Sequence, residues 1–90
     1  MEFEWDDKKE VKNEKKHGVS FHEAGTVFGD PLAITFEDPD HSANEQRLIT
    51  FGVSRLNRYI IVSHTERSAR MRIISAREMN KHERKIYEEG

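Results

Sequence analysis

The chain has 90 residues, of which 34% are hydrophobic and 36% are charged, and it contains no cysteine. A chain of this length can bury one small core, so we expect a single domain over residues 1–90. The absence of cysteine excludes disulfides, thiolate metal sites and cysteine nucleophiles. No apolar run approaches the roughly 20 residues that cross a bilayer, so we expect no membrane partner and a cytoplasmic location.

The net charge of −2 conceals two halves of opposite sign. Residues 1–45 carry five lysines and no arginine against twelve acidic residues, a net charge of −7. Residues 46–90 carry ten basic residues, including every arginine, against five acidic ones, a net charge of +5. This asymmetry indicates a polyanion as partner of the second half and a basic protein as partner of the first. The plainer alternative is that the charges only solvate a small surface.

The first half of the chain predicts a short strand followed by two helices. Residues 2–5 alternate polar and apolar side chains, as a half-buried strand does. Asp6 is placed to cap a helix that ends at Gly18, and Ser20 and Glu23 have the spacing of a capping box that opens a second helix. The aromatic residues expected in the core are Trp5, Phe21 and Phe28.

The second half predicts four strands and a final helix. Strands are expected over residues 32–37, 46–53 and, as a hairpin, 59–77, with an acidic loop over 38–45. Ser75 and Glu78 form another capping box, from which a helix would run to about Glu89. The order β-α-α-β-β-β-β-α predicts an α+β fold with a mainly antiparallel sheet, one face of which the helices cover.

The hairpin concentrates ionisable residues near its turn. By alternation, His64 and Glu66 share a face of the first strand, and Arg70 and Arg72 share a face of the second. If residues 67–69 form a three-residue loop, all four side chains lie on one face, about 5 Å apart across the ladder. The structural alternatives are that His64 is a packed core residue and that the ionisable groups form a surface salt-bridge ladder, which would contribute little stability.

This arrangement favours cleavage of RNA without a metal. Such a reaction needs a base for the 2′-hydroxyl, an acid for the leaving 5′-oxygen and cations around the phosphate. His64 and Glu66 could divide the proton transfers, while Arg72 holds the phosphate with Arg70 or Arg77. Arg77 has the opposite parity to Arg72, so it joins them only if the strand end bends.

Several further residues are candidates on weaker grounds. Arg47, on the neighbouring strand, either extends the cluster or is a solubility charge on an edge strand. Lys16 and His17 end the first predicted helix, where cations are favoured in any case, and they could also contact RNA. No histidine has the partners of a zinc site, so we expect no metal and no cofactor.

The sequence also resembles a known family over nearly its whole length. The matching segments, in chain order, are Phe3–Asp6, Lys16–Phe21, Glu23-Ala24, Val27-Phe28, Asp30–Leu32, Arg47, Gly52, His64–Arg67 and Arg72–Arg77. They are similar to the BrnT toxins of type II toxin–antitoxin systems.

The resemblance implies a RelE-like ribonuclease fold and a bacterial endoribonuclease that inhibits translation. It also implies a cognate BrnA antitoxin, a ribbon-helix-helix protein that neutralises the toxin and carries it to operator DNA. The family's motif positions map onto His64, Glu66, Arg67, Arg72 and Arg77, with Lys16 and His17 in addition. The residues themselves leave an alternative open, a small non-catalytic module that docks a protein or nucleic acid through its arginine-rich sheet.

Overall fold

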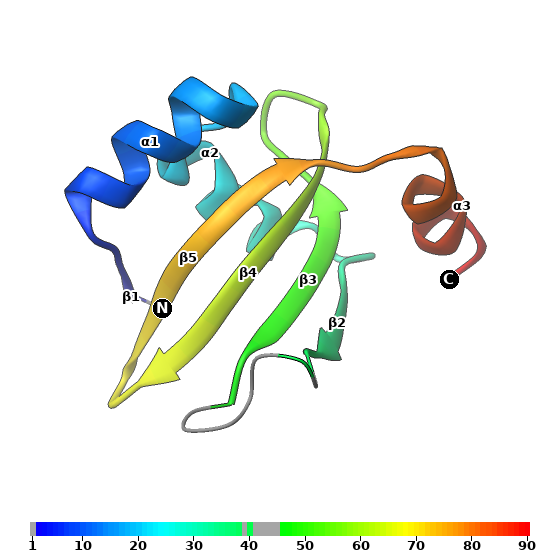
Figure 1. The fold of residues 1–90 in the computed structure, drawn as a ribbon. Coiled ribbons are helices and arrows are strands. Elements are labelled where there is room, and N and C mark those ends of the chain that lie inside the picture. Colours follow the sequence, from blue (N-terminus) through cyan, green and yellow to red (C-terminus); the bar gives the residue numbers. More distant parts are fainter. Residues whose placement is uncertain (1, 39, 41–45) are drawn as a thin grey trace.

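The computed structural model describes residues 2–38, 40 and 46–90, which form one sheet with helices around it (Figure 1). The strands are β1 (Glu2–Glu4), β2 (Ile34–Glu37), β3 (Leu48–Val53), β4 (Tyr59–Arg67) and β5 (Arg70–Glu78). The helices are α1 (Asp7–His17), α2 (Phe21–Thr26), its 3-10 continuation η1 (Val27–Gly29) and α3 (Lys81–Glu89). This order confirms the predicted α+β class. The predicted acidic loop falls largely on residues 39 and 41–45, outside the described residues.

The sheet has the order β1-β5-β4-β3-β2. Strands β2 to β5 pair antiparallel as a meander, while β1 adds to the outer edge of β5 in parallel. The prediction of a mainly antiparallel sheet is therefore confirmed. In the part of the chain that the structure describes, no helix is long and apolar enough to cross a membrane.

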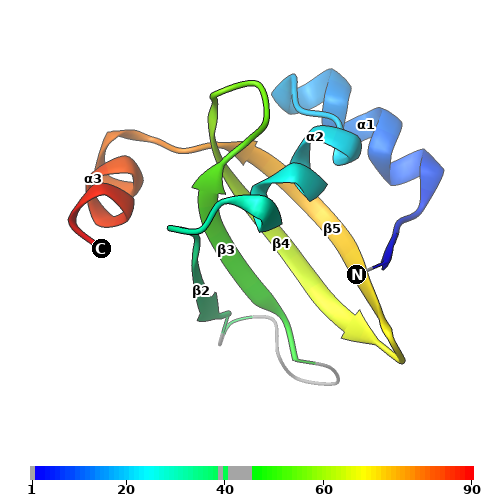
Figure 2. The ribbon, with the colours of Figure 1, turned by 180° about the vertical axis from the view of Figure 1, so that it is seen from behind.

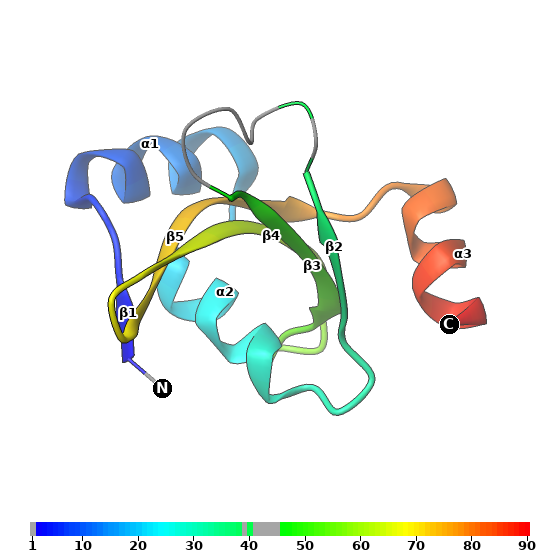
Figure 3. The ribbon, with the colours of Figure 1, turned by 90° about the horizontal axis from the view of Figure 1, so that it is seen from below.

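The two faces of the sheet are covered differently. Helix α2 and η1 lie against one face, which Figure 2 shows from behind and Figure 3 from below. Helix α1 packs against β5 on the other side, and α3 stands beyond β2 and β3 (Figure 3). The expectation that all helices cover one face is therefore wrong. We call the face under α2 the covered face and the other the open face.

The core lies between α2 and the covered face. Its buried residues are Val19, Phe21, Ala24, Val27, Ile60, Val62, Ile73 and Ala76, with Phe3, Trp5 and Phe28 packed against them. Gly52 explains how closely η1 approaches the sheet, because a Cβ at this position would lie 2.7 Å from Cγ1 of Val27. The expected core aromatics are thus confirmed.

Local signals set the ends of α1. The Asp6 carboxylate accepts a hydrogen bond from the Lys8 amide at 2.8 Å, and Gly18 ends the helix with φ +70°. Within the helix, Asn13 is buried against β5. Its side-chain amide donates to the Ala76 carbonyl at 2.8 Å and accepts from the Ala76 amide at 3.1 Å. Asn13 therefore pairs with the backbone of β5 beyond the point where β1 ends.

The start of α3 differs from the prediction. Strand β5 continues through Glu78, which pairs with Ile60, so Ser75 lies in the sheet and does not cap a helix. The helix begins at Lys81, and Asn80 and Glu83 form its capping box. At α2, Ser20 caps the helix as expected, but the Glu23 carboxylate binds Arg58 and Ser54 and does not return to the cap.

Candidate active site

The turn of the β4–β5 hairpin is one residue shorter than predicted. Arg67 pairs with Arg70, Glu66 with Met71 and Thr65 with Arg72, leaving a two-residue turn in which Ser68 has φ +56°. A one-residue change of register moves side chains to the opposite face. Arg72 therefore lies on the open face, whereas Glu66 lies on the covered face. The prediction that both arginines share a face with His64 and Glu66 is wrong.

His64 lies in the core of the covered face. Its side chain is 1% exposed and packs edge-on against Phe28, with ring centroids 4.9 Å apart. Nε2 lies 2.7 Å from Oγ1 of Thr50, and Nδ1 has no hydrogen-bond partner within residues 2–38, 40 and 46–90. Burial lowers the pKa of His64 to about 4, so the imidazole is neutral near pH 7. In this position His64 cannot reach an RNA phosphate.

A β-bulge in β5 brings Arg77 onto the same sheet face as Arg72, which alternation in the sequence alone did not predict. Ser63 pairs with Ser75, but the next residue, His64, pairs with Ile73, so Ile74 is an extra residue in β5. The extra residue reverses the alternation beyond it. Arg77 and Ser75 consequently lie on the open face, the same face as Arg72.

The open face carries a groove of about 260 Å³ between the end of α1 and the start of α3. The residues that line it are His17, Ile49, Phe51, Ile61, Ser63, Ser75, Ala76, Arg77 and Glu83. The large apolar residues, Ile49, Phe51 and Ile61, come from β3 and β4, and the two serines come from β4 and β5. The three ionisable residues come from three different elements, α1, β5 and α3.

Arg77 and Glu83 form a two-pronged ion pair at this groove. Nη1 and Nη2 of Arg77 each lie 2.8 Å from one oxygen of Glu83. The hydrogen bond from Arg77 is the main cause that lowers the pKa of Glu83, and the hydrogen bond to Glu83 raises the pKa of Arg77. Both groups are therefore charged near pH 7. A guanidinium that presents parallel N–H groups to a carboxylate has the geometry that binds a phosphate equally well.

Comparison with known proteins identifies the family. Residues 5–83 match the family model described as "Ribonuclease toxin, BrnT, of type II toxin-antitoxin system". The chain belongs to the BrnT family. RNA is thus the substrate of this chain and an antitoxin its partner, which favours the enzyme over the non-catalytic module.

A solved structure supports the fold of this BrnT chain. The ribonuclease toxin BrnT of Brucella abortus superimposes with a TM-score of 0.71 at 24% identity, over 90% of this chain and 99% of that one. None of the curated proteins matches the chain.

Arg70 and Arg72 lie apart from the groove residues, and each lies beside a carboxylate. Nη1 of Arg72, which is partly buried, lies 3.0 Å from the Glu4 carboxylate. Nε of Arg70 lies 3.6 Å from the Glu2 carboxylate near the exposed turn. Arg67 ends β4 opposite Arg70 and is exposed.

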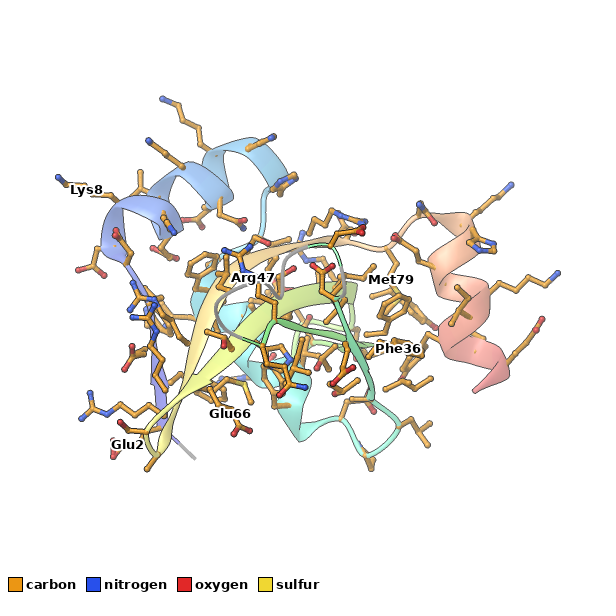
Figure 4. All side chains as sticks on the ribbon, turned by 60° about the horizontal axis from the view of Figure 1, so that its bottom comes forward. Glu2, Lys8, Phe36, Arg47, Glu66 and Met79 are labelled. Atoms are coloured by element: carbon orange, nitrogen blue, oxygen red, sulfur yellow. The ribbon has the colours of Figure 1, made fainter. Side chains whose placement is uncertain are left out.

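The remaining predicted residues divide between the two faces. Glu66 is exposed on the covered face, and Figure 4 shows it and Arg47 on opposite sides of β4. Arg47 is half-buried just before β3, and strand alternation places it on the open face with Ile49. Lys16 is exposed beside His17 in the last turn of α1.

The sequence interpretation missed Glu83, Ser63 and Ser75. Glu83 was not recognised because the final helix was predicted to begin five residues too early, which placed Glu83 in the helix interior. The spacing of Asn80 and Glu83, which is also that of a capping box, was the signal that could have revealed it. Among the described residues, no group of three or more His, Asp and Glu side chains could hold a metal ion.

Proposed function

We propose that this chain is a metal-independent endoribonuclease whose active site is the groove of the open face. The observation that carries the proposal is the meeting of His17, Arg77 and Glu83 around one groove, from three separate elements. These side chains supply a cation for the phosphate and two groups able to transfer protons. His64, the candidate base on the covered face, is buried.

Each side chain has a role that follows from its chemistry. Arg77 binds the scissile phosphate through its paired N–H groups and stabilises the charge that develops on it. His17 and Glu83 divide the proton transfers: one takes the proton of the 2′-hydroxyl, whose oxygen attacks phosphorus, and the other protonates the leaving 5′-oxygen. The products are a 2′,3′-cyclic phosphate and a 5′-hydroxyl.

Binding of RNA requires an exchange of partners at Arg77. The phosphate takes the place of the Glu83 carboxylate on the guanidinium, which leaves Glu83 beside the reacting atoms. Before the exchange, the hydrogen bond from Arg77 lowers the pKa of Glu83, so the carboxylate is released in its ionised form, the form that accepts a proton. Lys16 and the open-face arginines, Arg47 and Arg72, extend the positive surface along which the RNA backbone lies.

A cleavage assay with a matched histidine variant tests this proposal. Purified protein is incubated with a synthetic RNA in excess EDTA, with and without ribosomes, and the ends of the products are identified by mass spectrometry. We expect cyclic-phosphate ends, loss of cleavage in His17→Ala and full cleavage in His22→Ala. His22 is exposed and packs on Trp5, outside the groove, which makes it the control. Intact RNA at high enzyme excess in every condition would refute the proposal.

The biological setting is part of the same proposal. The toxin acts in the bacterial cytoplasm as one RelE-like domain over residues 1–90, and RNA cleavage inhibits translation. The antitoxin is of the BrnA type, a ribbon-helix-helix protein that blocks the toxin and carries it to operator DNA. Expression of the chain should arrest growth, and co-expression of a BrnA-type protein should relieve the arrest. Arrest that persists with the antitoxin bound would contradict this assignment.

A further inference from the structure

Two serine hydroxyls stand within the apolar floor of the groove. Ser63 and Ser75 are paired residues on adjacent strands, so their side chains lie side by side on the open face. Both line the groove together with Ile49, Phe51 and Ile61. Neither hydroxyl makes a hydrogen bond to any residue that the structure describes. Both residues are half-buried, so their hydroxyls remain accessible and can pair with the polar groups of a ligand that enters the groove.

The β-bulge lies immediately beside this pair. Ile74, the extra residue of β5, separates Ser75 from the regular pairing of His64 with Ile73. Bulges re-aim side chains next to binding sites. Here the bulge turns Ser75 and Arg77 together toward the groove. Two residues apart on one strand face, they are separated by roughly 7 Å along the strand.

A nucleobase has the chemistry that this floor accepts. It is flat, it packs well on apolar and aromatic side chains, and its edge carries donors and acceptors that a serine hydroxyl can pair with. A groove of about 260 Å³ accommodates one base and not a base pair, so the base must be unstacked from its neighbours. Arg77, at the end of the groove, lies where the phosphate of the same nucleotide would be.

We propose that the groove floor is a base-recognition subsite, in which Ser63 and Ser75 read the edge of one unstacked nucleobase beside the scissile phosphate. The inference rests on the proposed function, because it takes RNA as the occupant of the groove. Charge supports that choice over an apolar side chain of the antitoxin: a phosphate can take the place of Glu83 on the Arg77 guanidinium in the groove, and Lys16 lies nearby in the last turn of α1. The subsite makes cleavage selective for a base in single-stranded RNA.

The test measures base discrimination by binding, without cleavage. The four ribonucleoside 3′-monophosphates are titrated, with ribose 5-phosphate as a baseless control, and affinities are taken from calorimetry or amide chemical shifts. We expect at least one base to bind tenfold or more above the weakest. The Ser63→Ala/Ser75→Ala double variant should bring that ratio close to one, because the hydroxyls that distinguish the base edges are then absent.

Two controls show whether the hydroxyls are responsible. Ser68→Gly removes a hydroxyl at the hairpin turn, where φ is +56°, and should leave the discrimination unchanged. Ser75→Thr keeps a hydroxyl and should retain most of it. Equal affinity for all four bases in the wild type, or discrimination that survives in the double variant, would overturn the inference.

The outcome is separable from that of the proposed function. If the protein cleaves RNA but binds all four nucleotides equally, the subsite is refuted and the ribonuclease stands. If it discriminates between bases through the two serines but leaves RNA intact, the subsite stands and the assignment of catalysis to the groove fails. Absence of any nucleotide binding would refute the subsite and indicate that another molecule fills the groove.

Discussion

Ionisable side chains differ in burial and charge between the two faces of the sheet. On the covered face, His64 is 1% exposed and neutral, and Phe28 of η1 packs against it. On the open face, Arg77 and Glu83 are charged, paired with each other and in contact with a groove. Both faces are built from the same strands, β4 and β5. Whether a helix lies above the strand thus decides whether a titratable group can act on a substrate.

The Glu23–Arg58 pair shows that charge on the covered side serves structure. Glu23 is 7% exposed, accepts a hydrogen bond from the Ser54 hydroxyl at 2.6 Å and is held ionised mainly by the Arg58 hydrogen bond, which lowers its pKa. Arg58 also donates to the Gly18 carbonyl at 2.8 Å. This network ties the turn between β3 and β4 to α2. A perturbed pKa is therefore not by itself the mark of a site in this molecule.

Substitution of His17 and of His64, each by glutamine, provides the sharpest contrast between the faces. We expect His17→Gln to reduce the initial rate of RNA cleavage by roughly 10²- to 10⁴-fold, the usual contribution of a general acid or base. Its free energy of unfolding should change by no more than about 0.5 kcal/mol, because the side chain is partly exposed. Cleavage rates and denaturant titrations of the same preparations provide both numbers.

His64 supplies the opposite half of this comparison. His64→Gln should lower the free energy of unfolding while the folded fraction still cleaves RNA at near the wild-type rate. A folded His64→Gln variant without activity would show that the covered face opens to expose this imidazole during catalysis. The assignment of chemistry to the open face would then be wrong.

Arg77 and Arg72 lie on the same face but differ in what they contact. Arg77→Ala should lower the cleavage rate by roughly 10²- to 10³-fold, because one donor to a developing oxyanion is worth that much. Arg77→Lys should recover little of the loss, since an ammonium cannot make the paired contact. Arg72→Ala is the matched control: it removes the contact with Glu4 and should change the rate only a few-fold. Rates measured at one ionic strength decide between them, and equal losses would place the phosphate between the two.

Much of the fold could be predicted because its signals are local. Asp6 and Gly18 mark the ends of α1 by side-chain chemistry and by a positive φ, and the alternation of β4 is visible in its sequence. The order of all elements follows from such signals. The start of α3 could not be predicted in the same way, because two capping boxes compete. Pairing of Glu78 with Ile60 in the sheet decides against the one at Ser75.

The site was harder to predict because it depends on register. The predicted three-residue loop, 67–69, and the observed two-residue turn, 68–69, leave the same strands in place but reverse which residues share a face with His64. The extra residue at Ile74 reverses the alternation a second time, and the sequence around it, Ile73-Ile74-Ser75, carries no signal that predicts a bulge. Simple alternation therefore set Arg77 on the opposite face from Arg72 and put Arg72 on the face of His64, and the pairing of β4 with β5 contradicts both placements.

As the pH falls, the part of the free energy of unfolding that depends on neutral His64 should decline before the ion pairs lose their charge. The folded pKa of His64, about 4, lies below its ordinary value of 6.5, so the unfolded chain takes up the proton first as the pH falls. The stabilising effect of a neutral His64 is complete above pH 6.5 and declines toward pH 4, by at most about 3 kcal/mol. Urea titrations at steps of pH across this window measure the decline.

A variant separates His64 from the carboxylates. The ordinary pKa is 4.5 for Glu23 and Glu83 and 3.8 for Asp30, and in the folded chain all three pKa values are lowered. The stability that these carboxylates provide is therefore lost mainly at a lower pH than the stability that depends on His64. The His64→Gln variant should be less stable at pH 7. Its free energy of unfolding should not change with pH between pH 6.5 and 4.5, unlike that of the wild type. If the decline persists in that variant, protonation of another group causes it.

Arg70 should show the smallest effect, although the sequence placed it at the centre of the site. The side chain of Arg70 is 58% exposed and that of its partner Glu2 is 69% exposed, and Nε of Arg70 lies 3.6 Å from the Glu2 carboxylate at the hairpin end. Exposed pairs of this kind contribute about 0–1 kcal/mol, so Arg70→Gln should leave the free energy of unfolding almost unchanged. Its cleavage rate should fall no more than about twofold in moderate salt, because distant charges are screened beyond roughly 10 Å. A loss comparable with that of Arg77→Ala would mean that RNA runs the full length of β5, from the turn to the groove.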